Sequence, residues 1–316
     1  MKIKNVAIIG AGAVGTALGS VLDEHKNDGE YNFFFAAAGN RAERIKKKGL
    51  LVNGKSIFPE VISDKLNIKL DLVIICVKNY DLDSAIDDLK NIIRKETIIL
   101  PLLNGVTAVE KVKKSFPDNE VLYGIIMRTD ANRTDANVTF NTLGEIQYGT
   151  KKGIINTEVT DAVGNFFTRA CIHANQYEDM EYMQWRKWLV NVGSNQVSVL
   201  TGAKFKYFGQ FEEIVYLMRD AMQEIVEISK KMNIGLTEKD REEIEKILIN
   251  YPPEKRTSML QDLEARRRTE IDYFAGTVVE LGKRVGVKTP VNQTLYYAIK
   301  AREKVYLAEK KEEEGI

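Results

Sequence analysis

The sequence contains only two cysteines, Cys76 and Cys171, among its 316 residues. Neither has metal-ligand spacing or a nearby histidine, so no disulfide framework or zinc site is indicated. Cys76 lies within the apolar run 72–77, where a buried and unreactive thiol is the simplest interpretation. We therefore expect a protein without a metal centre.

Long apolar runs and an excess of one charge are also lacking. No uninterrupted apolar stretch approaches the roughly 18 residues of a membrane span. The N-terminal segment is apolar only over residues 6–9 before Gly10, which is typical of a first strand and not of a signal peptide. Lys and Arg number 46 against 45 for Asp and Glu, so the net charge of +1 gives no reason to expect nucleic acid or an anionic membrane as partner. We expect a cytoplasmic protein.

The first half of the sequence alternates between strand and helix patterns, and the length of the chain favours two domains. The predicted strands are 6–9, 31–38, 72–77 and 97–103, and the predicted helices are 14–23, 41–48 and 84–93. This alternation predicts an α/β fold with a doubly wound parallel sheet. Segments 121–129 and 137–150 are also strand-like and could extend the sheet at its far edge.

Helical patterns dominate the second half. They cover residues 180–200, 211–232, 238–250 and 269–285. We therefore predict an N-terminal sheet domain, residues 1–178, and a C-terminal all-helical domain, residues 179–316. The charged tail 304–316 is interpreted as a solvated, frayed helix end.

Three glycines in the segment VAIIGAGAVG follow the spacing G-x-G-x-x-G: Gly10, Gly12 and Gly15. They come directly after a predicted strand and open a predicted helix, which is the context of a dinucleotide-binding loop. Gly10 permits the tight turn, Gly12 lets the backbone approach the pyrophosphate, and Gly15 allows close packing of helix on strand. A purely structural glycine turn fits this context less well. The pattern predicts a Rossmann domain whose cofactor-binding loop is Gly10, Ala11, Gly12, Ala13, Val14 and Gly15.

The end of the second predicted strand bears on the choice of cofactor. A carboxylate there would bind the ribose 2′-hydroxyl of NAD. The sequence instead runs from Ala36 to Arg41 without a carboxylate, and the first one is Glu43. Arg41 could meet a 2′-phosphate, although a surface position explains it equally well. We favour NADPH.

Histidine, the usual proton donor in carbonyl reduction, occurs only as His25 and His173. His25 lies in the polar stretch DEHKND, away from any motif, and His173 precedes the predicted domain boundary. Surface or structural roles are the simpler interpretation of both. A histidine-based hydroxy-acid dehydrogenase is therefore disfavoured.

A polar stripe offers another proton donor. Lys187, Asn191 and Asn195 are spaced i, i+4 and i+8 in an otherwise apolar predicted helix, so they share one face. Polar groups buried on such a helix need partners. A lysine supplies a proton, and asparagines supply donors and acceptors that could hold the lysine or a substrate. Alternatively, Lys187 reaches solvent and the asparagines bind loop backbone; the spacing alone leaves both interpretations open.

The sequence resembles the ketopantoate reductase family along most of its length. The similar segments are GAGAVG at 10–15, ICVKNYD at 75–81, LLNGV at 102–106, W-x-K-x-x-x-N-x-x-x-N at 185–195, SMLQDLEARRRTEID at 258–272 and LGKRVGVKTPVNQTL at 281–295. The resemblance implies a helical domain like the C-terminal domain of 6-phosphogluconate dehydrogenase. It also implies NADPH-dependent reduction of 2-dehydropantoate (ketopantoate) to (R)-pantoate, a step of pantothenate and coenzyme A biosynthesis.

Two alternatives accompany this prediction. One is the same reduction of another branched 2-keto acid, because fold and motif determine the reaction better than the substrate. The other, from a different class, is a protein that senses NAD(P) without turnover, which the lysine–asparagine stripe disfavours. In either case we expect a small-molecule partner, no nucleic acid and no membrane, and we allow for a homodimer.

The resemblance also implies roles for individual residues of the helical half. Lys187 would be the general acid that protonates the carbonyl oxygen, and Asn191 and Asn195 would orient it and bind substrate. Ser258 would contact the substrate carboxylate, and Glu270 would bind the substrate hydroxyl. Thr269 is a plausible N-cap, so Glu270 would stand at a helix start, where stabilising the helix dipole is the alternative to binding.

In the sheet domain the resemblance implies that Lys78 lies by the cofactor and Asn104 beside the nicotinamide. Both directly follow predicted strands, where an open α/β sheet binds its ligands. The sequence also departs from the family. Leu103 replaces a glutamine, Phe205 stands where some members have a substrate-binding asparagine, Arg266 to Arg268 replace a small turn, and alanines replace an arginine after the second strand. These departures leave the particular keto acid and the choice of NADPH open.

Overall fold

The computed structural model describes residues 1–26, 29–63 and 68–314, and the chain divides into two compact units, Met1–Glu181 and Tyr182–Ile316. No helix among the described residues is long and apolar enough to cross a bilayer. Each unit has its own architecture.

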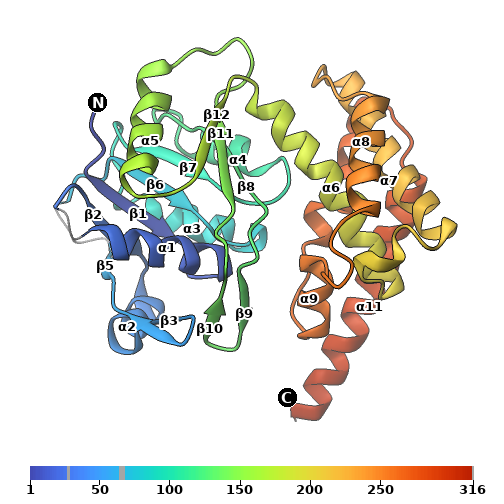
Figure 1. The fold of residues 1–316 in the computed structure, drawn as a ribbon, viewed down its shortest axis with the longest axis horizontal. Coiled ribbons are helices and arrows are strands. Elements are labelled where there is room, and N and C mark those ends of the chain that lie inside the picture. The colour runs from blue at the N-terminus through green and yellow to red at the C-terminus, as the bar shows by residue number, and fades with distance from the viewer. Residues whose placement is uncertain (27–28, 64–67, 315–316) are drawn as a thin grey trace. The chain divides into compact units, whose positions relative to one another are not determined.

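The first unit is built on a five-stranded parallel sheet with the strand order β5-β2-β1-β6-β7 (Figure 1). The strands are β1 (Asn5–Ile9), β2 (Asn32–Ala36), β5 (Glu60–Ile62), β6 (Leu72–Ile75) and β7 (Ile98–Pro101), and the helices that follow four of them are α1 (Ala13–His25), α2 (Gly39–Lys48), α3 (Leu82–Leu89) and α4 (Ala108–Ser115). The chain builds outward from β1 to β5 and then returns to add β6 on the other side of β1. The predicted doubly wound sheet is confirmed, and its topological switch point lies between β1 and β6.

The central strands are buried on both faces. Every residue of β6 is fully buried, as are Val6, Ala7 and Ile8 of β1. This explains why their sequences are continuously apolar and do not alternate with polar residues. The sheet is therefore a rigid base for the loops at its carboxyl edge.

The predicted extension of this sheet by residues 121–150 is only partly right. Segment 121–129 joins β7 through a single parallel bridge, Ile99 to Val121, and then forms β8 (Tyr123–Met127) of a separate sheet with β11 (Glu145–Gly149) and β12 (Ala174–Tyr177), next to α5 (Thr157–Arg169). After β8 the chain turns at Arg128, which has φ +58°. The hairpin of β9 (Asn132–Thr134) and β10 (Asn137–Thr139) pairs with β3 (Leu50–Val52) and β4 (Lys55–Ile57) and lies beside α1 (Figure 1).

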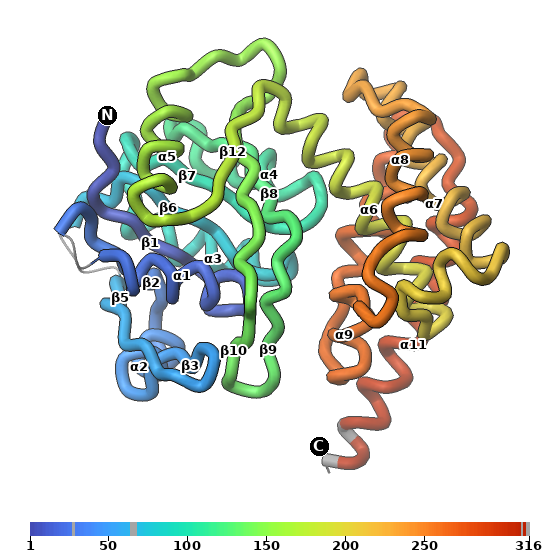
Figure 2. The backbone as a smooth tube through the Cα atoms, viewed as in Figure 1, coloured from blue at the N-terminus to red at the C-terminus, as the bar shows by residue number. Residues whose placement is uncertain are grey.

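The second unit contains no strand among its described residues, which confirms the all-helical prediction. Its helices are α6 (Met180–Thr201), α7 (Glu212–Lys231), α8 (Glu238–Ile249), α9 (Ser258–Glu264), α10 (Ala275–Val285) and α11 (Pro290–Glu314), with 3₁₀ turns η3 (Phe205–Tyr207) and η4 (Ile271–Tyr273). Helix α7 packs against α8, α10 and α11. Figure 2 shows α11 as the long red helix that ends the chain.

Two helix predictions need correction here. The helix expected over 269–285 begins only at Ala275, because Phe274, with φ −103° and ψ −92°, departs from helical geometry and separates α10 from η4. The tail expected to fray is helical through Glu314, and the hydroxyl of Tyr306 donates to the carbonyl of Arg267. Residues 315 and 316 of that tail lie outside the described residues.

Buried polar contacts fix α6 within the second unit. Gln196 donates from Nε2 to Oδ1 of Asn292 on α11 at 3.0 Å, and Asn292 donates to Oε2 of Glu224 on α7 at 2.7 Å. Near the start of α6, the hydroxyl of Tyr182 donates to Asp240 of α8. Helices α11 and α8 therefore bind α6 directly and α7 binds α11, so the side chains of α6 have a rigid support.

Candidate active site

The three glycines of the G-x-G-x-x-G motif differ in how much space surrounds them. At Gly10, φ is +110° and a Cβ would lie 2.6 Å from the carbonyl carbon of Cys76, so only glycine fits. At Gly15, a Cβ would lie 1.9 Å from the carbonyl oxygen of Gly10. At Gly12, by contrast, the nearest atom to a Cβ would be the carbonyl oxygen of Cys76 at 3.9 Å. The first and third glycines thus allow close packing, while Gly12 borders open space that a ligand can approach.

The open space beside Gly12 suits an anion. Gly12 is the N-cap of α1, no side chain caps the helix, and the first turn contains no acidic residue. The N–H groups and dipole of the first turn therefore favour a phosphate group. Arg133 of β9 also donates from Nη1 to the carbonyl oxygen of Ala11 at 3.1 Å, which puts a cation beside the loop. Sequence reasoning missed Arg133, because 122 positions separate the two residues and no local pattern connects them.

On the other side of the switch point, Lys78 and Asn104 lie three residues after the ends of their strands. Lys78 follows β6 and Asn104 follows β7, and both are partly buried. Asn79 is buried and donates from Nδ2 to the backbone carbonyl of Asn104 at 2.8 Å. This bond ties the two strand ends together at the edge where an open sheet binds its ligands. Asn79 lies inside the segment ICVKNYD, but its role depends on the partner strand and could not be inferred from that segment alone.

The region after β2 offers no carboxylate for a ribose hydroxyl. The first acidic residue, Glu43, lies on the exposed face of α2, 4.0 Å from Lys46 and 3.9 Å from Lys47. Asn40 and Arg41 are exposed in the first turn of α2. This arrangement is compatible with a ribose 2′-phosphate.

In the second unit, the polar stripe of α6 includes a perturbed lysine. Burial of the Lys187 ammonium group lowers its pKa from 10.5 to about 8, and the negative charge of Glu270 partly opposes that shift. Glu270 is itself only 2% exposed. A lysine with a pKa near neutrality transfers its proton more readily than an ordinary surface lysine. As a whole residue Lys187 is only partly buried, so part of its side chain also reaches solvent.

The two asparagines of the stripe are oriented by backbone and side-chain contacts. The N–H of Met259 donates to Oδ1 of Asn195 at 3.0 Å, as does Oγ of Ser258 at 3.1 Å. A backbone N–H can only donate, so the oxygen of the Asn195 amide must face it. Nδ2 of Asn195 then donates to Oδ1 of Asn191 at 3.5 Å.

This chain of contacts determines which way the Asn191 amide points. Its oxygen faces Asn195, so its Nδ2 faces away, buried and without a hydrogen-bond partner among the described residues. Leaving a buried donor unpaired costs about 1–3 kcal/mol, a cost that an acceptor on a ligand would remove. The site therefore presents an oriented amide donor one helical turn from Lys187.

Glu270 stands at the start of a 3₁₀ turn and not of an α-helix, so its predicted position is only partly right. It is the N-cap of the three-residue turn η4, and α10 begins five residues later. Thr269 Oγ1 accepts from the backbone N–H of Ile271 at 3.4 Å, while the carboxylate of Asp272 binds Lys300 and Tyr296, each at 3.0 Å. Stabilising an α-helix dipole is therefore excluded as the role of Glu270.

The remaining titratable candidates lie elsewhere. His25 ends α1, with Nδ1 2.9 Å from the carbonyl oxygen of Val21, and His173 is exposed before β12. Burial raises the pKa of the Cys76 thiol to about 12, which makes it inert at neutral pH. Within the described ranges, no three His, Cys, Asp or Glu side chains are grouped to hold a metal ion.

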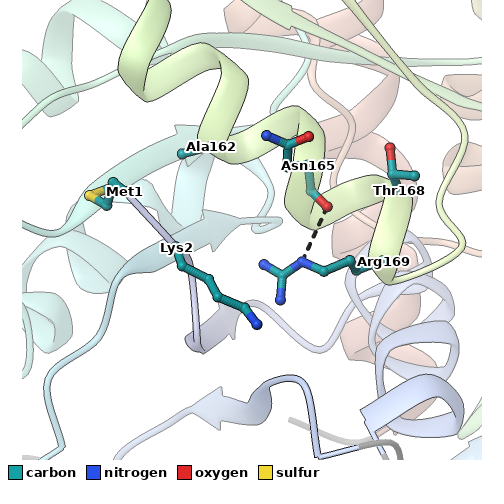
Figure 3. A pocket seen from close by; sticks show the side chains of 6 residues that line it. All are labelled: Met1, Lys2, Ala162, Asn165, Thr168 and Arg169. Atoms are coloured by element: carbon teal, nitrogen blue, oxygen red, sulfur yellow. Dashed lines mark hydrogen bonds between the residues drawn. The ribbon is translucent and has the colours of Figure 1, made fainter.

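A pocket of the first unit contains none of the predicted site residues. Figure 3 shows its lining, Met1, Lys2, Ala162, Asn165, Thr168 and Arg169. Arg169 donates to the carbonyl oxygens of Asn165 and Ile3, at 3.3 Å and 2.8 Å, and to Glu30 at 3.2 Å. These bonds tie α5 to the start of the chain.

A Rossmann-type sheet with an open glycine loop, together with a helical unit that holds a partly buried lysine of lowered pKa, is the arrangement of an α/β oxidoreductase. The family model described as "Ketopantoate reductase PanE/ApbA" matches residues 6–153, and its C-terminal counterpart matches residues 179–303. The chain belongs to the ketopantoate reductase family.

Individual relatives cover nearly the whole chain. It is 28% identical to the 2-dehydropantoate 2-reductase of Pyrococcus horikoshii over 94% of this chain and 97% of that protein. The structure of 2-dehydropantoate 2-reductase from Methylococcus capsulatus matches with a TM-score of 0.80 and 25% identity, over 95% and 96% of the two chains. A D-mandelate dehydrogenase, solved with NADH and anilino(oxo)acetate, matches with a TM-score of 0.83 over 95% and 99%, but at 23% identity it shows the fold alone.

Proposed function

We propose that this chain reduces ketopantoate to (R)-pantoate with NADPH, a step of pantothenate and coenzyme A biosynthesis. The observation that supports this most strongly is the unpaired, buried Nδ2 of Asn191 one helical turn from Lys187. A protein that only sensed nucleotides would need neither an oriented amide nor a lysine whose pKa is lowered to about 8.

The first unit would bind the cofactor. Gly12 and the first turn of α1 would bind the pyrophosphate, together with Ala11, Ala13 and Val14 of the same loop. Gly10 and Gly15 shape the loop through their close packing. Lys78 would lie by the cofactor and Asn104 beside the nicotinamide, which when bound supplies a hydride. NADPH is favoured over NADH because Glu43, the one carboxylate between β2 and the end of α2 at Lys48, lies beside the lysines of its own helix.

In the second unit, Lys187 would act as the general acid. Reduction of a ketone develops negative charge on the carbonyl oxygen, which a positioned cation stabilises and then protonates. Because burial disfavours its charged form, Lys187 loses its proton more readily than lysine in water. Nδ2 of Asn191 would donate a second hydrogen bond to an oxygen of the keto acid, and Asn195 would hold Asn191 and Ser258 in place.

The remaining two residues would recognise the ends of the substrate. Ser258 is exposed, and its hydroxyl would turn its single proton from Oδ1 of Asn195 to the substrate carboxylate, while the N–H of Met259 keeps Asn195 oriented. Glu270 is a buried carboxylate, a strong acceptor for the single hydroxyl of ketopantoate. A buried acceptor of this kind discriminates against substrates without a hydroxyl, because they would lack the hydrogen bond to the carboxylate.

A second candidate substrate is a branched 2-keto acid without the hydroxyl group. The observation in its favour is Phe205, which stands where some family members have a substrate-binding asparagine. The Phe205 ring is buried against Tyr251 and Phe208, with centroids 4.5 Å and 5.2 Å away, so it supplies no polar contact.

One kinetic comparison separates these proposals. Initial rates of NADPH oxidation would be measured with ketopantoate and with 3,3-dimethyl-2-oxobutanoate, which has the same carbon skeleton and lacks the hydroxyl. We expect kcat/KM to favour ketopantoate by about 10²-fold or more, as for a site that hydrogen-bonds a substrate hydroxyl. Equal efficiency would transfer the assignment to the hydroxyl-free keto acid, and no oxidation with any 2-keto acid would favour a sensor. The same assay with NADH tests the preference for NADPH.

A further inference from the structure

The segment that bears Glu270 has little regular structure of its own. Between the end of α9 at Glu264 and the start of α10 at Ala275, its only element is the three-residue turn η4. Such a segment does not fix a side chain by itself, yet Glu270 is buried beside the charge of Lys187. Contacts from elsewhere in the unit must therefore hold it.

Those contacts come from one face of α11. Tyr296, Lys300 and Glu303 are spaced i, i+4 and i+7, so they share a helix face. Tyr296 and Lys300 each bind the carboxylate of Asp272 at 3.0 Å. One turn later, the hydroxyl of Tyr306 donates to the backbone of Arg267.

Glu303 makes the contact nearest to Glu270. Its Oε1 accepts the backbone N–H of Thr269, the preceding residue, at 2.6 Å. Glu303 is only 3% exposed, and its other oxygen lies 3.6 Å from the ammonium group of Lys300. A hydrogen bond to a buried carboxylate is among the stronger ones in proteins. It fixes the peptide plane between Arg268 and Thr269, and so the backbone one residue before Glu270.

We propose that Glu303 is a positioning residue of the reductase, which holds Glu270 against the substrate and Lys187 by binding the backbone N–H of Thr269. This inference rests on the proposed role of Glu270. It adds the C-terminal helix α11 to the elements that shape the active site, because the polar face of α11 would hold the segment 266–273 in place.

Two substitutions of Glu303 separate the effect of side-chain length from the effect of its negative charge. Glu303→Asp keeps the charge but shortens the side chain by one methylene, which draws the carboxylate away from Thr269. Glu303→Gln loses the charge but keeps an oxygen within reach of that N–H. We expect Glu303→Asp to lower kcat/KM for ketopantoate by about tenfold and Glu303→Gln to lower it less than about threefold, because only the first breaks the bond. Glu309→Asp is the matched control, since Glu309 is exposed on the same helix.

A second readout reports on Glu270 without turnover. The pKa of Lys187 would be measured by NMR with ¹³C-labelled lysine, its signal being assigned from a Lys187→Met sample. Because the charge of Glu270 raises the pKa of Lys187, Glu303→Asp should lower that pKa in the same direction as Glu270→Gln. The affinity for NADPH should stay unchanged in every Glu303 variant. A purely structural role would lower the melting temperature without moving the Lys187 pKa.

A double-mutant cycle completes the test. If Glu303 acts through Glu270, Glu303→Asp should cause no further loss of kcat/KM in a Glu270→Ala background. The inference is overturned if Gln is as harmful as Asp, if the losses multiply in the double variant, or if the Lys187 pKa does not move. Failure of the proposed function would give a different result, because the wild-type enzyme would then leave ketopantoate unreduced. The NMR measurement of the Lys187 pKa would still decide whether Glu303 positions Glu270.

Discussion

Replacing Lys187 with alanine should remove the proton donor while leaving the fold intact. Helix α6, which bears Lys187, is held by the buried hydrogen bonds that link Gln196, Asn292 and Glu224, so it should keep its place when the Lys187 side chain is truncated. Loss of a general acid typically lowers the rate by about 10²–10⁴-fold, and we expect kcat for ketopantoate to fall in that range. Lys187→Arg should not restore it, because a guanidinium group holds its proton too tightly.

The pH dependence of the wild-type enzyme gives a magnitude that can be worked from the structure. With the pKa of Lys187 lowered to about 8, the reactive protonated form should dominate at pH 7 and decline above pH 8. A single titration at that pKa reduces the protonated fraction about tenfold between pH 7 and pH 9. Because Glu270 raises this pKa, Glu270→Gln should move the alkaline limb of kcat to lower pH.

The assay is steady-state NADPH oxidation at saturating ketopantoate across pH 6 to 10, with NADPH affinity measured separately as a control for the first unit. Near-normal kcat in Lys187→Ala, with the same alkaline limb as the wild type, would remove Lys187 from the mechanism. An alkaline limb that moves to higher pH in Glu270→Gln would show that the assigned charge interaction has the wrong sign.

Three further outcomes follow from the same geometry. Gly12→Val should weaken NADPH binding severely in a titration, because the valine side chain would fill the open space beside the loop. Unchanged affinity in a folded variant would refute the assignment of this loop to the cofactor. Glu270→Ala should lower kcat/KM for ketopantoate and spare NADPH affinity; a loss of thermal stability alone would leave Glu270 a structural residue. Lys187→Met should stabilise the fold, because the pKa lowered from 10.5 to about 8 corresponds to a cost of up to roughly 3 kcal/mol below pH 8. Between pH 8 and pH 10.5 the unfolded chain binds more protons than the native one, so this cost should fade as the pH rises. Chemical denaturation should therefore show a smaller difference in the free energy of unfolding between wild type and variant at pH 10 than at pH 7.

The sequence was most informative where local pattern and burial coincide. The apolar run of β6 and the glycine loop after β1 are read directly from neighbouring residues, and both lie as predicted. The spacing of Lys187 and Asn191 also placed them on one helix face, because the helical period is fixed by the backbone.

What the sequence could not provide are contacts between distant segments. The hydrogen bond from Arg133 to Ala11 spans 122 positions, and the bond from Thr269 to Glu303 spans 34. The β9–β10 hairpin pairs with β3 and not with the edge of the main sheet, a choice made by tertiary packing. Likewise, nothing in the sequence shows that the Asn191 amide is left with an unpaired donor, because that depends on Met259 fixing the orientation of Asn195.

Isotope transfer tests the central claim most directly. The enzyme would be incubated with ketopantoate and NADPH deuterated at C4 of the nicotinamide, separately for each face of the ring, and the product analysed by mass spectrometry. The account predicts (R)-pantoate that carries deuterium at C2 from one of the two labelled cofactors, formed about 10²-fold or more slowly by the Lys187→Ala variant. Absence of labelled pantoate from the wild-type enzyme with either cofactor would contradict it.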